Sequence, residues 1–195
     1  MATKGNTIIN QITGQRITFV QTARDTDGAS MVMDEYVPAN GLVDQEHVHP
    51  QQEETFSVLA GTMEFYVAEA TLKASAGESV VVPAGVPHAF ANKGEGEAVM
   101  RVTYRPALNT EGFFEAFFGL SQDGKMDPKT GLPNLLQIAV LAQAYRKEIA
   151  FGGIPVLVQR ILFGALAPIG RLLGYRADYP YPYQKAVRGQ AVTAR

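Results

Sequence analysis

Hydrophobic and polar positions alternate with a period of two along much of the first 105 residues. Six short segments carry this pattern or are rich in β-branched and aromatic residues: 16–22, 30–37, 55–61, 62–70, 78–85 and 97–106. Successive side chains of a strand point to opposite faces, so Met100, Val102 and Tyr104 are expected on one buried face. Turn residues separate the segments at short spacing. Many short antiparallel strands of this kind predict a sandwich or a barrel.

Beyond Pro106 the pattern changes to that of helices. Residues 109–119 contain two phenylalanine pairs at i,i+4 spacing, Phe113/Phe117 and Phe114/Phe118, and Gly119 is a plausible stop. The phenylalanines are expected to cap the barrel as part of its core. A second apolar stripe, broken by Gly152 and Gly153, predicts another helix; its members are Leu135, Ile138, Ala142, Tyr145 and Ile149.

Residues 154–174 are apolar at most positions. Arg160 and Arg171 fall on one line of the expected helix because 11 residues are close to three turns. That line is the expected solvated face, and Pro168 is expected to kink or end the helix near Ala167. A helix that is apolar almost all round must be buried, paired with another chain or laid on a membrane. Its uncharged runs are too short to span a bilayer.

Three regions follow from these patterns. Residues 1–106 form a β domain, and residues 107–183 form a helical extension that packs on the barrel, a partner subunit or a membrane surface. Residues 184–195 are expected to be a disordered tail. We expect a homodimer, because so apolar a surface is seldom left exposed on a monomer, with peripheral membrane or subunit contact through residues 149–174.

Composition excludes several classes of function. The 195 residues are 46% hydrophobic and 18% charged with a net charge of -2, which suits a soluble globular domain. No basic block is present, so no nucleic-acid partner is expected. The absence of cysteine excludes disulfides, thiolate metal sites and cysteine nucleophiles. The first 19 residues have no apolar core of signal-peptide length, which predicts a cytoplasmic protein, with the possible membrane contact only peripheral.

Two of the three histidines stand two residues apart. His47 and His49 can reach one ion from one strand, and a later carboxylate can return across a hairpin. The third, His88, follows a strand and a Pro/Gly turn that would present it to the same interior. An isolated His-x-His pair on a strand is more often solvated than metal-bound, so this pair alone is a weak signal.

Two stretches together make the signal specific. The first reads Gly41, five residues, His47-x-His49, four residues, Glu54, six residues and Gly61. The second reads Gly77, five residues, Pro83-x-Gly85, two residues, His88, three residues and Asn92. These stretches resemble the two motifs of the cupin superfamily, as found in bacterial single-domain, metal-binding cupins.

The resemblance implies a fold and a site. The fold would be a cupin-type antiparallel β-barrel, or jelly roll, followed by the C-terminal helices. One divalent transition metal, Fe, Mn, Ni, Co or Zn, would be held by His47, His49, Glu54 and His88, with positions left open for water, substrate or dioxygen. Glu54 is preferred to Glu53 because it alone lies six residues before the motif glycine. Strand alternation also places Glu54 on the face of Phe56.

The motifs predict metal binding without naming a reaction. With all three histidines as ligands, no Ser-His-Asp triad remains, so any chemistry is expected at the metal and no other catalytic residue is assigned. The first hypothesis is a dioxygenase-type oxidoreductase acting on a small apolar or aromatic compound. The alternatives are a non-oxidative isomerase or lyase and a non-catalytic small-molecule binder. Methionine and aromatic residues on the inward faces suit an apolar ligand or are barrel core only; Glu35, Arg101 and Tyr66 could add polar contacts, but their faces stay open.

Overall fold

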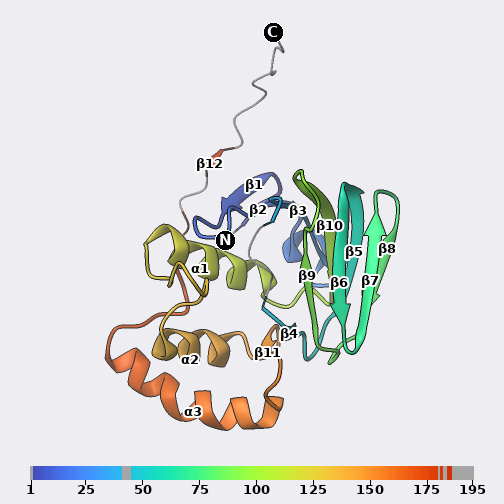
Figure 1. The fold of residues 1–195 in the computed structure, drawn as a ribbon. Coiled ribbons are helices and arrows are strands. Elements are labelled where there is room, and N and C mark those ends of the chain that lie inside the picture. Colours follow the sequence, from blue (N-terminus) through green and yellow to red (C-terminus); the bar gives the residue numbers. More distant parts are fainter. Residues whose placement is uncertain (1, 41–44, 180, 182–183, 186–195) are drawn as a thin grey trace.

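Two antiparallel sheets form the β part of the protein (Figure 1). The computed structural model describes residues 2–40, 45–179, 181 and 184–185. The larger sheet has the order β12 (Gln184–Lys185), β1 (Asn6–Ile9), β2 (Arg16–Gln21), β3 (Met31–Val37), β10 (Ala98–Arg105), β5 (Glu53–Ala60) and β8 (Ser79–Val82). The smaller sheet has the order β11 (Ala150–Phe151), β4 (His47–Val48), β9 (His88–Ala91), β6 (Thr62–Val67) and β7 (Ala70–Ser75). This arrangement confirms the predicted jelly-roll barrel followed by helices.

Alternating burial creates the core between the sheets. In β3 and β10 every second residue is buried, and the two strands pair along their length from Met31↔Tyr104 to Val37↔Ala98. The inward side chains fill the barrel with methionine and aromatic groups, since methionine adapts to irregular gaps. The methionine and aromatic residues expected on the inward faces are buried; they are Met31, Met33, Phe56, Met63, Phe65, Phe90, Met100 and Tyr104.

Strands without alternation escaped the sequence analysis. All four residues of β9 are buried, and five of the six residues of β7 are exposed, so neither has the two-sided pattern of a half-buried strand. The short strand β1 was missed as well. Gln184 and Lys185 pair with β1, so these two residues of the expected tail are a strand. The rest of residues 184–195 lies outside the described residues.

The helices differ from their predicted bounds. Helix α1 (Thr110–Gln122) runs through Gly119, so the predicted stop there is wrong. Helix α3 (Val156–Leu172) runs through Pro168, so of the two predicted effects of this proline, the end of the helix does not occur. Helix α2 (Leu135–Ala144) is ten residues long, and Tyr145 is its C-cap. The predicted continuation to Ile149 is wrong because the chain turns and then enters β11, which pairs with β4 of the barrel.

The helices pack in a cluster of their own beside the sheets. In Figure 1, α1 lies next to the barrel, α2 below it, and α3 lowest. Buried residues of α1, α2 and the connecting loop form this second core: Ala116, Leu120, Met126, Leu141 and Tyr145. The Tyr145 hydroxyl lies 2.9 Å from the Gly112 carbonyl and 3.1 Å from the Ala177 carbonyl, so it joins α1 to the chain after α3. None of the helices in the described part of the chain is long and apolar enough to cross a bilayer.

Two glycines of α3 provide a matched test of its packing on α2. A Cβ atom at Gly170 would lie 2.8 Å from the Val140 Cγ2 and 3.0 Å from the Leu136 carbonyl, whereas at Gly164 it would meet nothing within 4 Å. Overpacking costs about 1–3 kcal/mol, against a gain of about 1 kcal/mol in helix propensity. Gly170→Ala is therefore expected to lower the free energy of unfolding in urea, and Gly164→Ala to raise it. Equal stability of the two variants would contradict this packing.

Candidate metal centre

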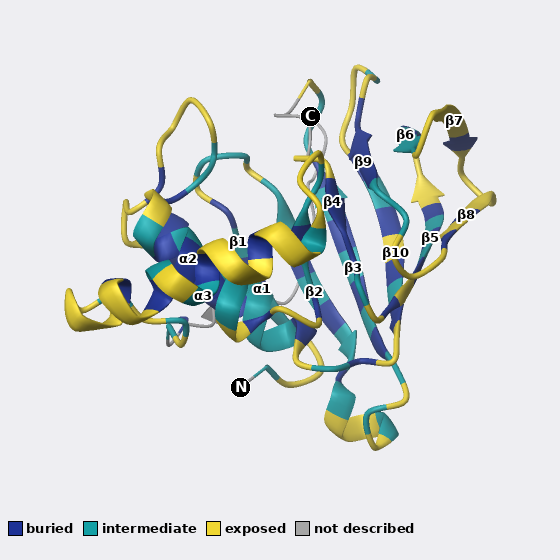
Figure 2. Cartoon of the chain, turned by 90° about the horizontal axis from the view of Figure 1, so that it is seen from below, coloured by how far each residue is buried: buried dark blue, intermediate teal, exposed yellow. Residues whose placement is uncertain are grey.

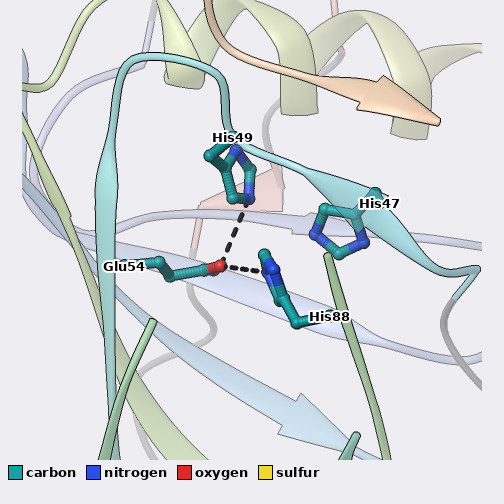
Figure 3. A group of neighbouring side chains, drawn as sticks. All are labelled: His47, His49, Glu54 and His88. Atoms are coloured by element: carbon teal, nitrogen blue, oxygen red, sulfur yellow. Dashed lines mark hydrogen bonds and ion pairs between the residues drawn. The ribbon is translucent and has the colours of Figure 1, made fainter. Parts of the chain in front are cut away.

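Three strands bring the motif side chains together inside the barrel (Figure 3). His47 lies on β4 directly opposite His88 on β9, and His49 follows β4 by one residue. Glu54 points inward from β5, where it pairs with Tyr104 of β10. One possible ligand atom from each of the four side chains lies within 4.8 Å of the others, so the group could hold a metal ion. All four side chains are buried.

Glu54 is the centre of this cluster. Its Oε2 lies 2.7 Å from the His88 Nε2 and 3.2 Å from the His49 Nε2. The His49 Nε2 is buried and has no hydrogen-bond partner of good geometry. Figure 3 shows both imidazoles directed at the carboxylate, with His47 beside them. The rings of His47 and His88 have centroids 4.4 Å apart.

Backbone carbonyls orient all three imidazoles. The Nδ1 atoms of His47, His49 and His88 lie 2.8, 2.5 and 3.0 Å from the carbonyl oxygens of Gln45, Glu148 and Val86 respectively. A carbonyl oxygen can only accept, so each Nδ1 carries the hydrogen and each Nε2 keeps its lone pair. A neutral His88 then faces the Glu54 carboxylate, 2.7 Å away, with two acceptors and no hydrogen between them. Such a pair needs a cation, either a proton or a metal ion.

Burial sets the protonation of the cluster. Desolvation, together with the neighbouring His49 and His88, lowers the pKa of His47 to about 3, so this ring is neutral at pH 7. Burial alone would raise the pKa of the Glu54 carboxyl. A positive charge on His49 and His88, with the hydrogen bonds that the protonated rings then donate, outweighs burial and holds that pKa below its usual value. A neutral imidazole and an ionised carboxylate are the states that a divalent ion requires.

The comparison with protein families decides the identity of this domain. The model of the cupin domain matches residues 33–104, a range that contains all four side chains of the cluster. Residues 33–104 form a cupin domain. None of the curated proteins compared with it matches.

Solved cupin structures resemble the barrel at low identity. An RmlC-like cupin from Shewanella frigidimarina is 18% identical over 53% of this chain and 86% of its own, with a TM-score of 0.46. KdgF from Halomonas sp. is 17% identical over 50% of this chain and 85% of its own, with a TM-score of 0.45. The dimethylsulfoniopropionate (DMSP) lyase DddQ from Ruegeria pomeroyi is 30% identical over 42% and 40%, with a TM-score of 0.38. All three TM-scores lie below 0.5, and we assign neither substrate nor reaction from them.

Other cupin motif residues shape turns. Asn92 donates to the carbonyls of Val37 and Gly96 at 2.9 and 2.7 Å and accepts from the Gly94 amide at 2.9 Å. Gly61 has φ +78°, and a Cβ there would lie 3.0 Å from the Ala98 Cβ. Both residues therefore stabilise turns of the barrel. The first motif glycine, Gly41, lies outside the described residues.

The donor set of the cupin cluster fits a divalent transition metal. Three imidazole nitrogens and one carboxylate oxygen suit Fe, Mn, Ni, Co or Zn and do not choose among them. A metal ion would give the buried Nε2 of His49 a partner. It would also bind the two facing acceptor atoms, His88 Nε2 and Glu54 Oε2. Glu53 is exposed at the start of β5, so strand alternation separates the two glutamates as expected.

The helical extension completes the surroundings of the cluster. The Glu148 carbonyl holds the His49 ring, and β11 pairs with the strand that carries His47. Gly152 also donates its amide to the Glu46 carbonyl at 2.7 Å. The extension therefore contributes main-chain contacts to the surroundings of the cluster. Sequence reasoning missed this contribution because a main-chain carbonyl can come from any residue type.

A cavity of about 140 Å³ joins the cluster to the extension. His47, His49 and Glu54 form part of its wall, and Phe113, Phe114, Phe117 and Phe118 of α1 form another part. The phenylalanines thus line a cavity as well as capping the barrel, which the sequence analysis did not anticipate. Residues 130–133 and the α2 residues Ile138, Leu141 and Ala142 also contribute.

The structure shows which faces are occupied by Glu35, Arg101 and Tyr66, the three polar residues that the sequence left open. Glu35 is buried, lines the cavity and accepts a hydrogen bond from the Gln15 Nε2 at 3.1 Å. Arg101 is exposed and forms two hydrogen bonds with Asp34 at 2.8 and 2.9 Å, and Tyr66 donates to Glu64. Only Glu35 belongs to the interior.

Proposed function

We propose that this cupin binds one divalent transition metal through His47, His49, Glu54 and His88, and that the metal acts on a small organic molecule in the adjoining cavity. The observation that carries the proposal is the orientation of the imidazoles. Backbone carbonyls hold three Nδ1 atoms, and the three imidazoles and the buried Glu54 carboxylate each offer one possible ligand atom within 4.8 Å of the others. Ligand orientation by hydrogen bonds of this kind is typical of metal sites.

The cavity favours a small and largely apolar ligand. Its volume of about 140 Å³ is close to that of cavities that accept a benzene-sized molecule, about 150 Å³. The described lining includes the four phenylalanines of α1 and has no lysine or arginine. A ligand there would contact aromatic side chains of α1. The polar end formed by Gln15 and Glu35 could accept hydrogen bonds from it.

We infer a dioxygenase-type oxidoreductase as the reaction class. A bound redox-active metal would supply dioxygen activation, or Lewis-acid polarisation if it were not redox-active. The chain's own residues would position the ion. A non-oxidative isomerase or lyase, or a small-molecule binder, is the alternative, since the same donor set supports all three.

Elemental analysis and oxygen uptake test this proposal. Protein purified without chelator is expected to contain about one Fe, Mn, Ni, Co or Zn per chain, because the cluster offers four donors to a single ion. Small aromatic compounds of about benzene size are then offered to the loaded protein in an oxygen electrode. Oxygen consumption that stops on chelation supports the oxidoreductase, and turnover without oxygen uptake favours the lyase or isomerase. A protein that takes up no divalent metal would contradict the metal site itself.

A further inference from the structure

Helix α3 exposes an apolar side to solvent. Its buried residues, Gln159, Phe163, Ala167 and Gly170, face the rest of the protein. The opposite side is apolar and lies in solvent; its most exposed members are Leu157 and Ile161, each 69% exposed, and Leu172, 89% exposed. Figure 2 views the molecule from below, the side on which α3 is the lowest element of Figure 1.

Gln159 explains why this orientation is adopted. Its Nε2 donates to the carbonyls of Phe151 and Ile154 at 2.7 Å, and its Oε1 accepts from the Phe151 amide at 2.9 Å. The side chain is buried because it satisfies backbone groups of β11 and of the turn after it. The expectation that the line of Arg160 and Arg171 is the solvated face is therefore only half correct: both arginines are exposed, but beside an apolar face.

Positive charge borders this apolar face. Residues 149–177 contain Arg160, Arg171 and Arg176 and no aspartate or glutamate. Arg146 and Arg160 also line a small crevice between α2, β11 and α3. Among the described residues, no carboxylate forms an ion pair with any of these arginines. A guanidinium group can bind a phosphate oxygen through charge-assisted hydrogen bonds, so arginines at the edge of this face suit a phosphate-bearing surface.

We propose that α3 lies in the surface of an anionic phospholipid bilayer, with Leu157, Ile161 and Leu172 inserted and the arginines on lipid phosphates. The helix is 17 residues long, about 25 Å at 1.5 Å per residue, and it is not a spanning helix. An amphipathic helix with apolar residues on one side and arginines at its edge binds in the plane of the interface. The arginine side chains can keep their charged ends among the headgroups while their stems remain in apolar surroundings.

Charge favours a bilayer over a second copy of the chain. A two-fold dimer would place the same face of α3 against itself, because the interface uses one patch twice. The arginines of both copies would then approach one another, and α3 carries no carboxylate to pair with them. A bilayer that contains phosphatidylglycerol supplies both an apolar layer and negative charge.

Vesicle cosedimentation tests the proposal. The full-length protein is incubated with phosphatidylcholine vesicles and with vesicles that contain about 30% phosphatidylglycerol. Binding is expected only to the anionic vesicles and should weaken in about 0.5 M salt, where charges are screened. Arg160→Gln and Arg171→Gln should each weaken binding about fivefold, the effect of one basic residue near an anionic surface.

Matched variants separate insertion from folding. Ile161→Ser and Leu172→Ser change residues that are exposed, so both proteins should fold, yet vesicle binding is expected to be lost. Val81→Ser is the control, since Val81 is 53% exposed on β8 and lies outside α3. Unchanged metal content in all three variants keeps this test independent of the proposed function. Absence of binding, or equal binding to both vesicle types, would overturn the proposal. So would a dimer in light scattering that Ile161→Ser converts to a monomer, which would assign the face to a second copy.

Discussion

Replacing Glu54 by glutamine is expected to lower the affinity of the protein for divalent metal by at least about 100-fold. Loss of a residue that only supports a ligand already costs about 10–100-fold, and Glu54 would itself be a ligand. Its Oε2 lies within 3.2 Å of two imidazole nitrogens at the centre of the cluster. The amide keeps the shape of the side chain and removes the negative charge. The measurement is metal titration of the metal-free protein.

Glu53→Gln is the matched control. Glu53 precedes Glu54 on β5 but is exposed, because neighbouring residues of a strand point to opposite faces. The control is expected to keep the affinity of the unaltered protein. Equal loss in both variants would mean that general electrostatic attraction, rather than a ligand, holds the metal. An unchanged affinity in Glu54→Gln would remove Glu54 from the site.

Replacing Ala150 by proline is expected to weaken metal binding by about 10–100-fold, the cost of losing a supporting contact, although Ala150 would touch no metal. Ala150 pairs with Val48 and Phe151 pairs with His47. The Gly152 amide donates to the Glu46 carbonyl, and the Phe151 amide donates to Gln159. In an antiparallel ladder every second residue pair is hydrogen-bonded. Because the pair of Gly152 and Glu46 is bonded, the next bonded pair is Ala150 and Val48, and the Ala150 amide donates to β4. Proline removes that donor and restricts Ile149, which should move the neighbouring Glu148 carbonyl away from His49.

A change at Glu148 separates the main chain from the side chain. Glu148→Gln keeps the carbonyl that lies 2.5 Å from the His49 Nδ1, and its amide oxygen can still accept from the Asn109 amide. This variant is expected to bind metal as the unaltered protein does. Retained affinity in Ala150→Pro would show that the His49 ring needs no carbonyl to orient it. Lost affinity in Glu148→Gln would point to the carboxylate instead.

Sequence motifs and strand alternation predicted the four residues of the cluster. The main-chain groups around them depend on pairing between segments far apart in the sequence, which these patterns do not predict. Alternation along β5 placed Glu54 inside and Glu53 outside, and the second motif supplied His88. Strand β11 is only two residues long and has no pattern of its own, so nothing in the sequence links it to β4. The orientation of α3 was equally hidden. It depends on hydrogen bonds between the Gln159 side chain and the Phe151 backbone. Helical periodicity does not predict such a contact, because it considers only whether residues are apolar or polar.

The hydrogen bond between His49 and Glu148 joins residues 99 positions apart, and this separation has a consequence for biosynthesis. Apart from the two-residue strands β11 and β12, β10 is the last strand, and it ends at Arg105. The ribosome therefore synthesises most of the barrel before it reaches Glu148. At about 5–20 residues per second, the remaining stretch takes a few seconds. During that interval the histidines of the first motif exist without the carbonyl that orients His49. For the proposed metal, the nascent barrel would therefore be an incomplete receptor, and we expect loading to follow the release of the C-terminal segment.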